Sequence, residues 1–148
     1  MNELTHLDAQ GNVSMVDVSA KPIQQREAVA RGEIHLQPET LRRIQQNEIA
    51  KGNVLATARL SGIMAAKKTG DLIPLCHPLA ITHCEIQFDL QPDRIAITAT
   101  ARVAAQTGVE MEALTAVSLA ALTIYDMCKA IDKTMRIEGV YLVSKTKK

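Results

Sequence analysis

The segment ITHCEIQFDLQPDRIAITATARV, residues 81–103, decides the fold of this chain. It predicts two strands, Ile81–Leu90 and Arg94–Val103, joined by a three-residue hairpin turn at residues 91–93. The second strand alternates strictly, which is typical of a strand that buries one face. Its apolar positions are Ile95, Ile97, Ala99 and Ala101.

The residues before this hairpin predict one further strand and two helices. Arg26–Leu36 is the strand, because apolar side chains recur at every second position. Pro38 opens a short helix, where proline is tolerated in the first turn. Asn53 predicts the N-cap of a second helix, which Gly70 ends. Residues 1–22 are expected to be irregular.

A long helix, about Val109–Ile131, and a last strand, Thr134–Lys145, follow the hairpin, with Gly139 as a β-bulge. The order is then β-α-α-β-β-α-β, which is the split βαβ pattern of ferredoxin-like folds if the two early helices act as one crossover. We therefore predict an α+β, ferredoxin-like fold for a single domain of residues 1–148. Its sheet is mostly antiparallel and four-stranded, with helices packed on one face.

The long helix is apolar on nearly all sides, which one small sheet cannot cover. This pattern predicts a homo-oligomer with active sites near its interfaces.

The gross composition excludes several classes of protein. A formal net charge of +1 over 148 residues carries no nucleic-acid signature. Three cysteines without a CxxC pair indicate reduced thiols in a cytoplasmic protein. Residues 1–6 lack the basic and apolar regions of a signal peptide, and the weakly polar run Ala113–Tyr125 is too short for a membrane span. We expect neither a nucleic acid nor a membrane as partner.

Two pairs of ionisable residues lie in the long helix. Asp126 and Lys129 are three residues apart, so they face the same neighbour as an acid/base pair or as a structural salt bridge. Glu110 and Glu112 open the helix and point to different sides. Dipole compensation explains one of these carboxylates, whereas binding of a guanine-like base would explain either.

Polar residues before the hairpin suggest a binding loop or a metal site. Cys76 and His77 lie between a helix end and a strand, where loops present functional groups. Together with His83 and Cys84 they suggest zinc, but adjacent residues of an extended chain face opposite sides and the spacing fits no common zinc site. Lys51, before Gly52 and a helix N-terminus, suits a phosphate, although the Walker spacing is absent.

Longer motifs resemble the MoaC family of cyclic pyranopterin monophosphate synthases. The resemblance extends over roughly residues 5–145 and is strongest in three stretches. These are DLIPLCHPL (residues 71–79), TGVEMEAL (residues 107–114) and ALTIYDMCKA (residues 121–130).

The resemblance implies a hexamer, arranged as a trimer of dimers, with active sites at a dimer interface. It implies a lyase of molybdenum cofactor biosynthesis. Such an enzyme converts (8S)-3',8-cyclo-7,8-dihydroguanosine 5'-triphosphate to cyclic pyranopterin monophosphate and releases diphosphate. It implies no metal ligands and no resident cofactor, and it leaves open whether Mg²⁺ accompanies the triphosphate.

The resemblance also assigns roles to individual residues. Asp126 is the acid/base candidate, and Lys129 sets its ionisation, shuttles protons or holds phosphate. The polar clamp for the base is Leu75, Cys76, His77, Met111 and Glu112. The cations for the phosphates are Lys51, Lys67, His77, Lys129 and Lys145, with Lys21 and Arg26 as helpers.

The chain departs from the family pattern at Asn53, where an Asp is common, and at Gln106, where a basic residue is common. Three other classes compete with the lyase: a non-catalytic nucleotide- or RNA-binding module, a metal-dependent hydrolase and a small-molecule sensor. The strands lack the exposed aromatic residues with which an RNA-binding sheet stacks bases.

Overall fold

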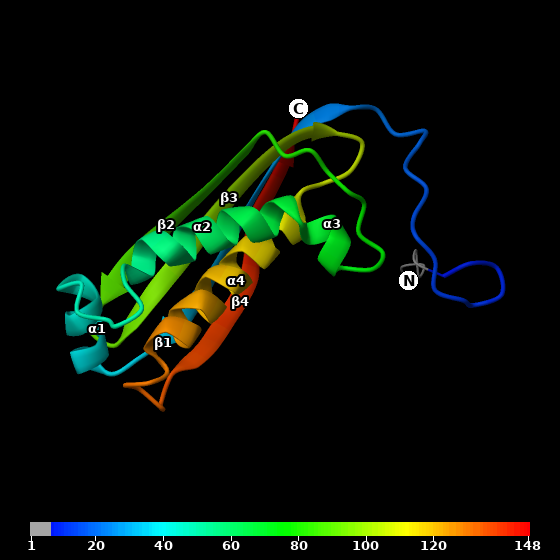
Figure 1. Cartoon of the computed structure of the whole chain (residues 1–148). Helices are drawn as coiled ribbons and strands as arrows, with labels where there is room; N and C mark the ends of the chain where they lie inside the picture. Colours follow the sequence, from blue (N-terminus) through cyan, green and yellow to red (C-terminus); the bar gives the residue numbers. More distant parts are fainter. Residues whose placement is uncertain (1–6) are drawn as a thin grey trace.

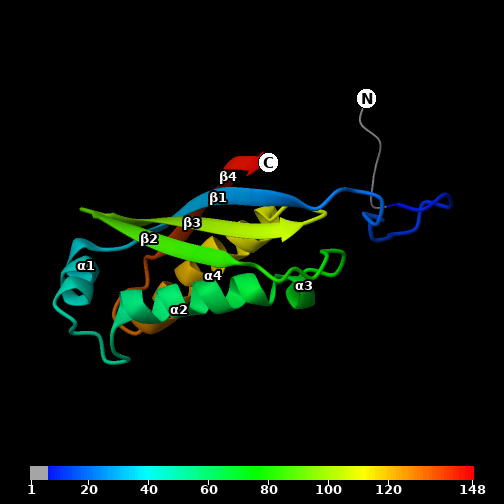
Figure 2. The same ribbon diagram turned by 90° about the horizontal axis from the view of Figure 1, so that it is seen from above.

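The computed structural model describes residues 7–148 and contains one four-stranded sheet with helices on one face. The strand order is β2-β3-β1-β4, and each neighbouring pair is antiparallel. Figures 1 and 2 show α2 and α4 side by side on the same face of the sheet and α1 at one end. The elements are β1 (Gln24–His35), α1 (Pro38–Gln45), α2 (Val54–Lys67), α3 (Thr69–Leu72), β2 (His83–Gln91), β3 (Arg94–Ala105), α4 (Glu110–Cys128) and β4 (Arg136–Lys147).

This arrangement confirms the α+β, ferredoxin-like prediction. Strand β3 lies between β1 and β2, and β1 lies between β3 and β4, so each crossover skips one strand. The sheet is wholly antiparallel rather than mostly so. Residues 7–22 contain no strand apart from one bridge between Leu7 and Val13, and the remaining part of the expected irregular segment, residues 1–6, lies outside the described residues.

The core is built from aliphatic side chains and very close packing. The side of β1 and β3 that faces the helices carries fully buried Ala and Ile residues, including Ile34 and Ile97. A Cβ at Gly32 would approach Val117 Cγ1 to 2.7 Å, and one at Gly62 would approach the carbonyl oxygen of Ala116 to 2.9 Å. Glycine at these positions therefore lets α4 lie directly on the sheet and α2 directly on α4.

The structure corrects the predicted hairpin turn and the predicted end of the second helix. Gln91 pairs with Arg94, so the hairpin turn has two residues, not three. Gly70 does not end the helical segment, since α2 ends at Lys67 and the short α3 runs through Gly70. A glycine fits there because its Cα packs on Pro78, whose Cα would lie 2.9 Å from a Cβ.

The long helix ends three residues earlier than predicted, at Cys128, because Asp132 holds the following loop against α1. The buried Asp132 carboxylate accepts hydrogen bonds from Gln37 N (2.9 Å), Thr40 Oγ1 (2.8 Å) and Thr134 N (2.8 Å). These contacts turn the chain away from the helix axis before β4 begins.

Two further sequence predictions concern α4 and β4. By length and composition alone, α4 is apolar enough to cross a membrane, but most of it is buried in the fold and its composition serves that packing. The β-bulge at Gly139 is confirmed: its φ is +62°, and the register between β1 and β4 shifts beside it.

Candidate active site

The structure divides the predicted site residues between the two ends of α4. Glu110 and Asp126 are sixteen residues apart, which corresponds to about 24 Å along an α-helix. Lys67 ends α2 near the N-terminal end of α4, where its side chain is exposed (Figure 1). One cluster lies at the N-terminal end of α4 and contains Lys21, Arg26, Leu75, Cys76, His77, Glu110, Met111, Glu112 and Lys145. The other lies at the C-terminal end of α4 and contains Lys51, Asp126 and Lys129.

Two adjoining pockets lie at the N-terminal end of α4. The first, here the cationic pocket, has a volume of about 290 Å³, and its cations are Lys21, Arg26, Lys145 and Lys147. The second, here the apolar pocket, has a volume of about 660 Å³ and is lined by residues 73–77, Leu79, Met111 and valines of the N-terminal segment. The two pockets share Lys21, Thr107, Gly108 and Glu110, so they form one continuous hollow.

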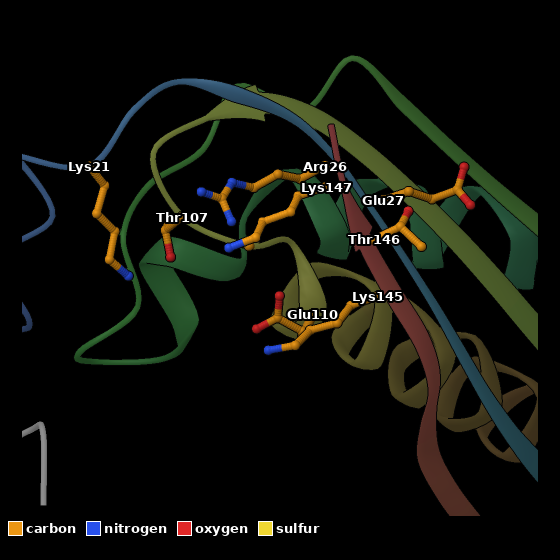
Figure 3. A pocket seen from close by; sticks show the side chains of 9 residues that line it. Lys21, Arg26, Glu27, Thr107, Glu110, Lys145, Thr146 and Lys147 are labelled. Atoms are coloured by element: carbon orange, nitrogen blue, oxygen red, sulfur yellow. The ribbon is translucent and has the colours of Figure 1, made fainter. Parts of the chain in front are cut away.

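Strand geometry explains the cationic pocket. Lys145 and Lys147 are two residues apart on β4, so both side chains leave the same side of the sheet. Arg26 is paired with Lys147, and Figure 3 shows both side chains directed to one side, whereas Glu27 and Thr146 point away. The sequence prediction missed Lys147, although the same period-two reasoning that describes the strands would have found it.

Two carbonyl oxygens fix the Arg26 guanidinium. Its Nε donates to Ala105 O at 3.1 Å, and its Nη2 donates to Gln106 O at 3.4 Å. The carboxylate of Glu110 lies directly over Gly108, where any Cβ would collide with Glu110 Oε1. Gly108 therefore leaves room for this carboxylate at the junction of the two pockets.

Glu112 is a buried carboxyl group in the first turn of α4. Only 1% of the residue is exposed, and among residues 7–148 its Oε1 has no hydrogen-bond partner. Its Oε2 accepts a long contact of 3.9 Å from the Cys76 thiol. Burial, together with the nearby Glu110 carboxylate, raises the pKa of Glu112 to about 7. The group can therefore exchange a proton near neutral pH, which suits an acid/base or base-recognition role.

His77 contacts the N-terminal segment. Its Nε2 lies 2.6 Å from the carbonyl oxygen of Val16. Because a carbonyl oxygen only accepts, this nitrogen must carry the proton, so we assign the Nε2–H tautomer. His77, which the sequence predicted as a phosphate ligand, is therefore also part of one wall of the apolar pocket.

A second cluster lies at the C-terminal end of α4. Asp126 Oδ2 accepts from Lys51 Nζ at 2.9 Å, and Asp126 Oδ1 accepts from Lys129 Nζ at 3.0 Å. Hydrogen bonds from Lys51 and Lys129 hold the pKa of Asp126 below its ordinary value. The predicted Asp126–Lys129 pairing is confirmed, and Lys51 is added from a loop distant in sequence. Two ammonium groups facing one carboxylate leave a net positive charge that suits a phosphate.

The structure gives no support to the zinc interpretation. Across residues 7–148, no group of three or more His, Cys, Asp or Glu side chains comes together in a way that could hold a metal. Cys76, Cys84 and Cys128 are free thiols. The His83 ring lies 3.9 Å from Glu85 on the exposed face of β2.

Fold and site together define a small α+β protein with a cationic pocket for an anionic small molecule and titratable groups beside it. Comparison with known proteins gives the family: the MoaC family matches residues 15–148. A cyclic pyranopterin monophosphate synthase of Roseiflexus castenholzii is 57% identical over 148 residues, which is 99% of this chain and 94% of the relative. The chain therefore belongs to the MoaC family.

Proteins with the same name in two other bacteria are similarly close. The Chloroflexus aurantiacus protein is 60% identical over 146 residues, covering 97% of this chain and 90% of the relative. The Desulfitobacterium hafniense protein is 59% identical over 145 residues, covering 97% of this chain and 89% of the relative.

Proposed function

We propose that this chain is a lyase of molybdenum cofactor biosynthesis. It converts (8S)-3',8-cyclo-7,8-dihydroguanosine 5'-triphosphate to cyclic pyranopterin monophosphate and releases diphosphate. Membership of the family and the shared name of the relatives support this reaction. The three free thiols support a cytoplasmic location for the enzyme. We propose that the enzyme has no resident cofactor.

The pockets suggest how the substrate is held. The triphosphate lies against Lys21, Arg26 and Lys145, because a cluster of cations in a concave surface binds a polyanion and the departing diphosphate. The base lies in the apolar pocket against residues 75–77 and Met111, and Glu112 completes this clamp from behind Cys76, whose thiol it contacts. A Glu112 carboxyl that exchanges its proton near neutral pH can both donate to and accept from a guanine-like edge.

The separation of the two clusters of site residues along α4 is the observation that supports an active site shared between subunits. Asp126 lies about 24 Å along α4 from Glu110, and one nucleotide does not span that distance within one subunit. We propose that Asp126, Lys129 and Lys51 of one subunit complete the pockets of another. The active site is then formed at an interface of a homo-oligomer, arranged as a hexameric trimer of dimers. Exposed apolar side chains on α2 and α4, including Leu60 and Leu122, support such interfaces.

In this site Asp126 acts first as a base. Its carboxylate is ionised at neutral pH because two ammonium groups neighbour it, so it accepts a proton when the base ring opens. Lys129 donates a proton as the ring closes in its new form, and Asp126 passes its proton to Lys129 across their 3.0 Å contact, which restores both groups. A substrate hydroxyl attacks the α-phosphorus, the bond to the β-phosphate breaks, and the proton of that hydroxyl leaves with the diphosphate, which the cations stabilise.

A turnover assay tests the reaction. Purified protein is mixed with the cyclised dihydro-GTP, and the pterin product and diphosphate are followed together. We expect both products, and we expect Asp126→Asn and Lys129→Ala to abolish turnover while the oligomer stays folded. Asp89→Asn, on the exposed face of β2, is the matched control and should keep full activity. Tight binding without product would overturn the lyase assignment.

Subunit mixing tests the composite site. Asp126→Asn and Lys145→Ala proteins, each inactive alone, are unfolded together and reassembled. In a two-fold dimer, half of the randomly formed pairs are mixed, and one of their two sites carries neither mutation, so about a quarter of the wild-type activity should return. No recovered activity in a correctly assembled oligomer would show that both residues act within one subunit.

A further inference from the structure

The N-terminal segment covers one side of the apolar pocket. We call residues 13–21 the strap; Val13, Val16, Val18 and Lys21 line the pocket. Within the strap, residues 14–18 alternate between half-buried and exposed, as in an extended segment that lies on a surface, whereas residues 19–21 are exposed. Its own turn is fixed by Asp17, whose Oδ1 accepts from Ser19 N (2.9 Å) and Ser19 Oγ (2.6 Å).

Gln106 ties this strap to the sheet. Its side-chain Nε2 donates to Ser19 O and Lys21 O, each at 3.2 Å, so both amide hydrogens are used. Two carbonyl oxygens only accept, which assigns the nitrogen rather than the oxygen of the amide to this position. His77 provides a second attachment through Val16 O at 2.6 Å.

The backbone of Gln106 also holds the neighbouring cation, Arg26, in place. Its carbonyl oxygen accepts from Arg26 Nη2 at 3.4 Å, beside the 3.1 Å contact of Arg26 Nε with Ala105 O. One residue at the end of β3 therefore touches both the backbone that carries Lys21 and the guanidinium of Arg26. Both cations line the cationic pocket, where Figure 3 shows Lys21 on one side of Thr107 and Arg26 on the other.

We propose that Gln106 is a positioning residue that holds the strap closed and so places Lys21 for the substrate's phosphates. This rests on the proposed function for the identity of the substrate. The physical argument is that Lys21 is exposed and its ammonium ends a flexible side chain, so only a fixed backbone can keep it over the pocket. A donor at position 106 is required, whereas the charge of that residue is not.

The test compares Gln106→Leu, which keeps the bulk but loses both donors, with Gln106→Arg, which retains donors. Gln87→Leu, on the exposed face of β2, is the matched control. Hydrogen exchange of strap amides is measured by mass spectrometry on each full-length oligomer. Binding of inorganic tripolyphosphate is measured by calorimetry, and kcat and KM are measured with the substrate. Thermal unfolding checks that each variant is folded.

Two lost hydrogen bonds should speed exchange of the strap amides about ten-fold in Gln106→Leu and weaken tripolyphosphate binding to a similar degree. KM should rise with kcat nearly unchanged, and Gln106→Arg should restore the slow exchange of the strap. Unchanged exchange in Gln106→Leu, or a loosened strap with unaltered tripolyphosphate affinity, would overturn the proposal. Absence of turnover in the wild-type protein would defeat the lyase assignment only, since exchange and tripolyphosphate binding would still decide the role of Gln106.

Discussion

Replacing Glu112 with Gln should remove a pH-dependent penalty from the folded protein. The carboxyl is 1% exposed, and burial raises its pKa from an ordinary 4.5 to about 7. Since the folded state then binds this proton more tightly than the unfolded state, stability is fully present below pH 4.5 and is lost as the pH rises towards 7. A shift of this size corresponds to about 3 kcal/mol.

Gln has nearly the same shape and does not titrate, so the variant lacks this loss. The free energy of unfolding is measured by urea denaturation between about pH 5 and pH 8, at one protein concentration because oligomer stability depends on it. The stability difference between wild type and Glu112→Gln should change by about 2 to 3 kcal/mol across that range, with the variant gaining at high pH.

The other titrating groups contribute equally to the stability of both proteins, so their contributions cancel and the difference reports the titration of Glu112. Glu85→Gln, on the exposed face of β2, is the control and should run parallel to the wild type. Parallel profiles for Glu112→Gln would refute the reasoning, because they would mean that Glu112 titrates alike in the folded and unfolded states. The same variant should also bind the substrate's base less well and show a lower kcat/KM.

Three glycine and aspartate substitutions give further predictions. Gly108→Ala should push the Glu110 carboxylate out of the pocket junction, raising KM several-fold with little change in unfolding; an unchanged KM would contradict this. Gly62→Ala should destabilise the protein by about 1 to 3 kcal/mol, because the new methyl group meets the backbone of Ala116; urea denaturation measures it, and a stabilised variant would exclude the clash. Asp132→Ala leaves buried donors unpaired and should cost about 3 kcal/mol in the same assay, whereas a loss below 1 kcal/mol would show that water replaces the carboxylate.

Local sequence patterns predicted much of the fold. The cap of α2 is an example: Asn53 Oδ1 accepts from Ala56 N at 2.9 Å, as the sequence predicted. The bulge at Gly139 and the ion pair of Asp126 with Lys129 were equally predictable. The cap and the ion pair join residues within a few positions of one another, so helix periodicity reveals them, and a glycine inside a strand pattern by itself indicates a bulge.

Contacts between distant residues were decided only by the tertiary structure. Lys51 meets Asp126 across 75 positions, and Gln106 meets Ser19 across 87. No periodic pattern records which residues the chain will bring together from such separations. The burial of Glu112, and hence its raised pKa, likewise depends on what packs over the start of α4.

The sequence by itself determined the family, the order of elements and most of the residue types available for chemistry. Only the tertiary structure decided that those residues form two clusters at opposite ends of one helix, because a rigid α-helix keeps its ends about 24 Å apart whatever the motif suggests. It also decided that the strap joins the pocket, since the side-chain hydrogen bonds of Gln106 place it there.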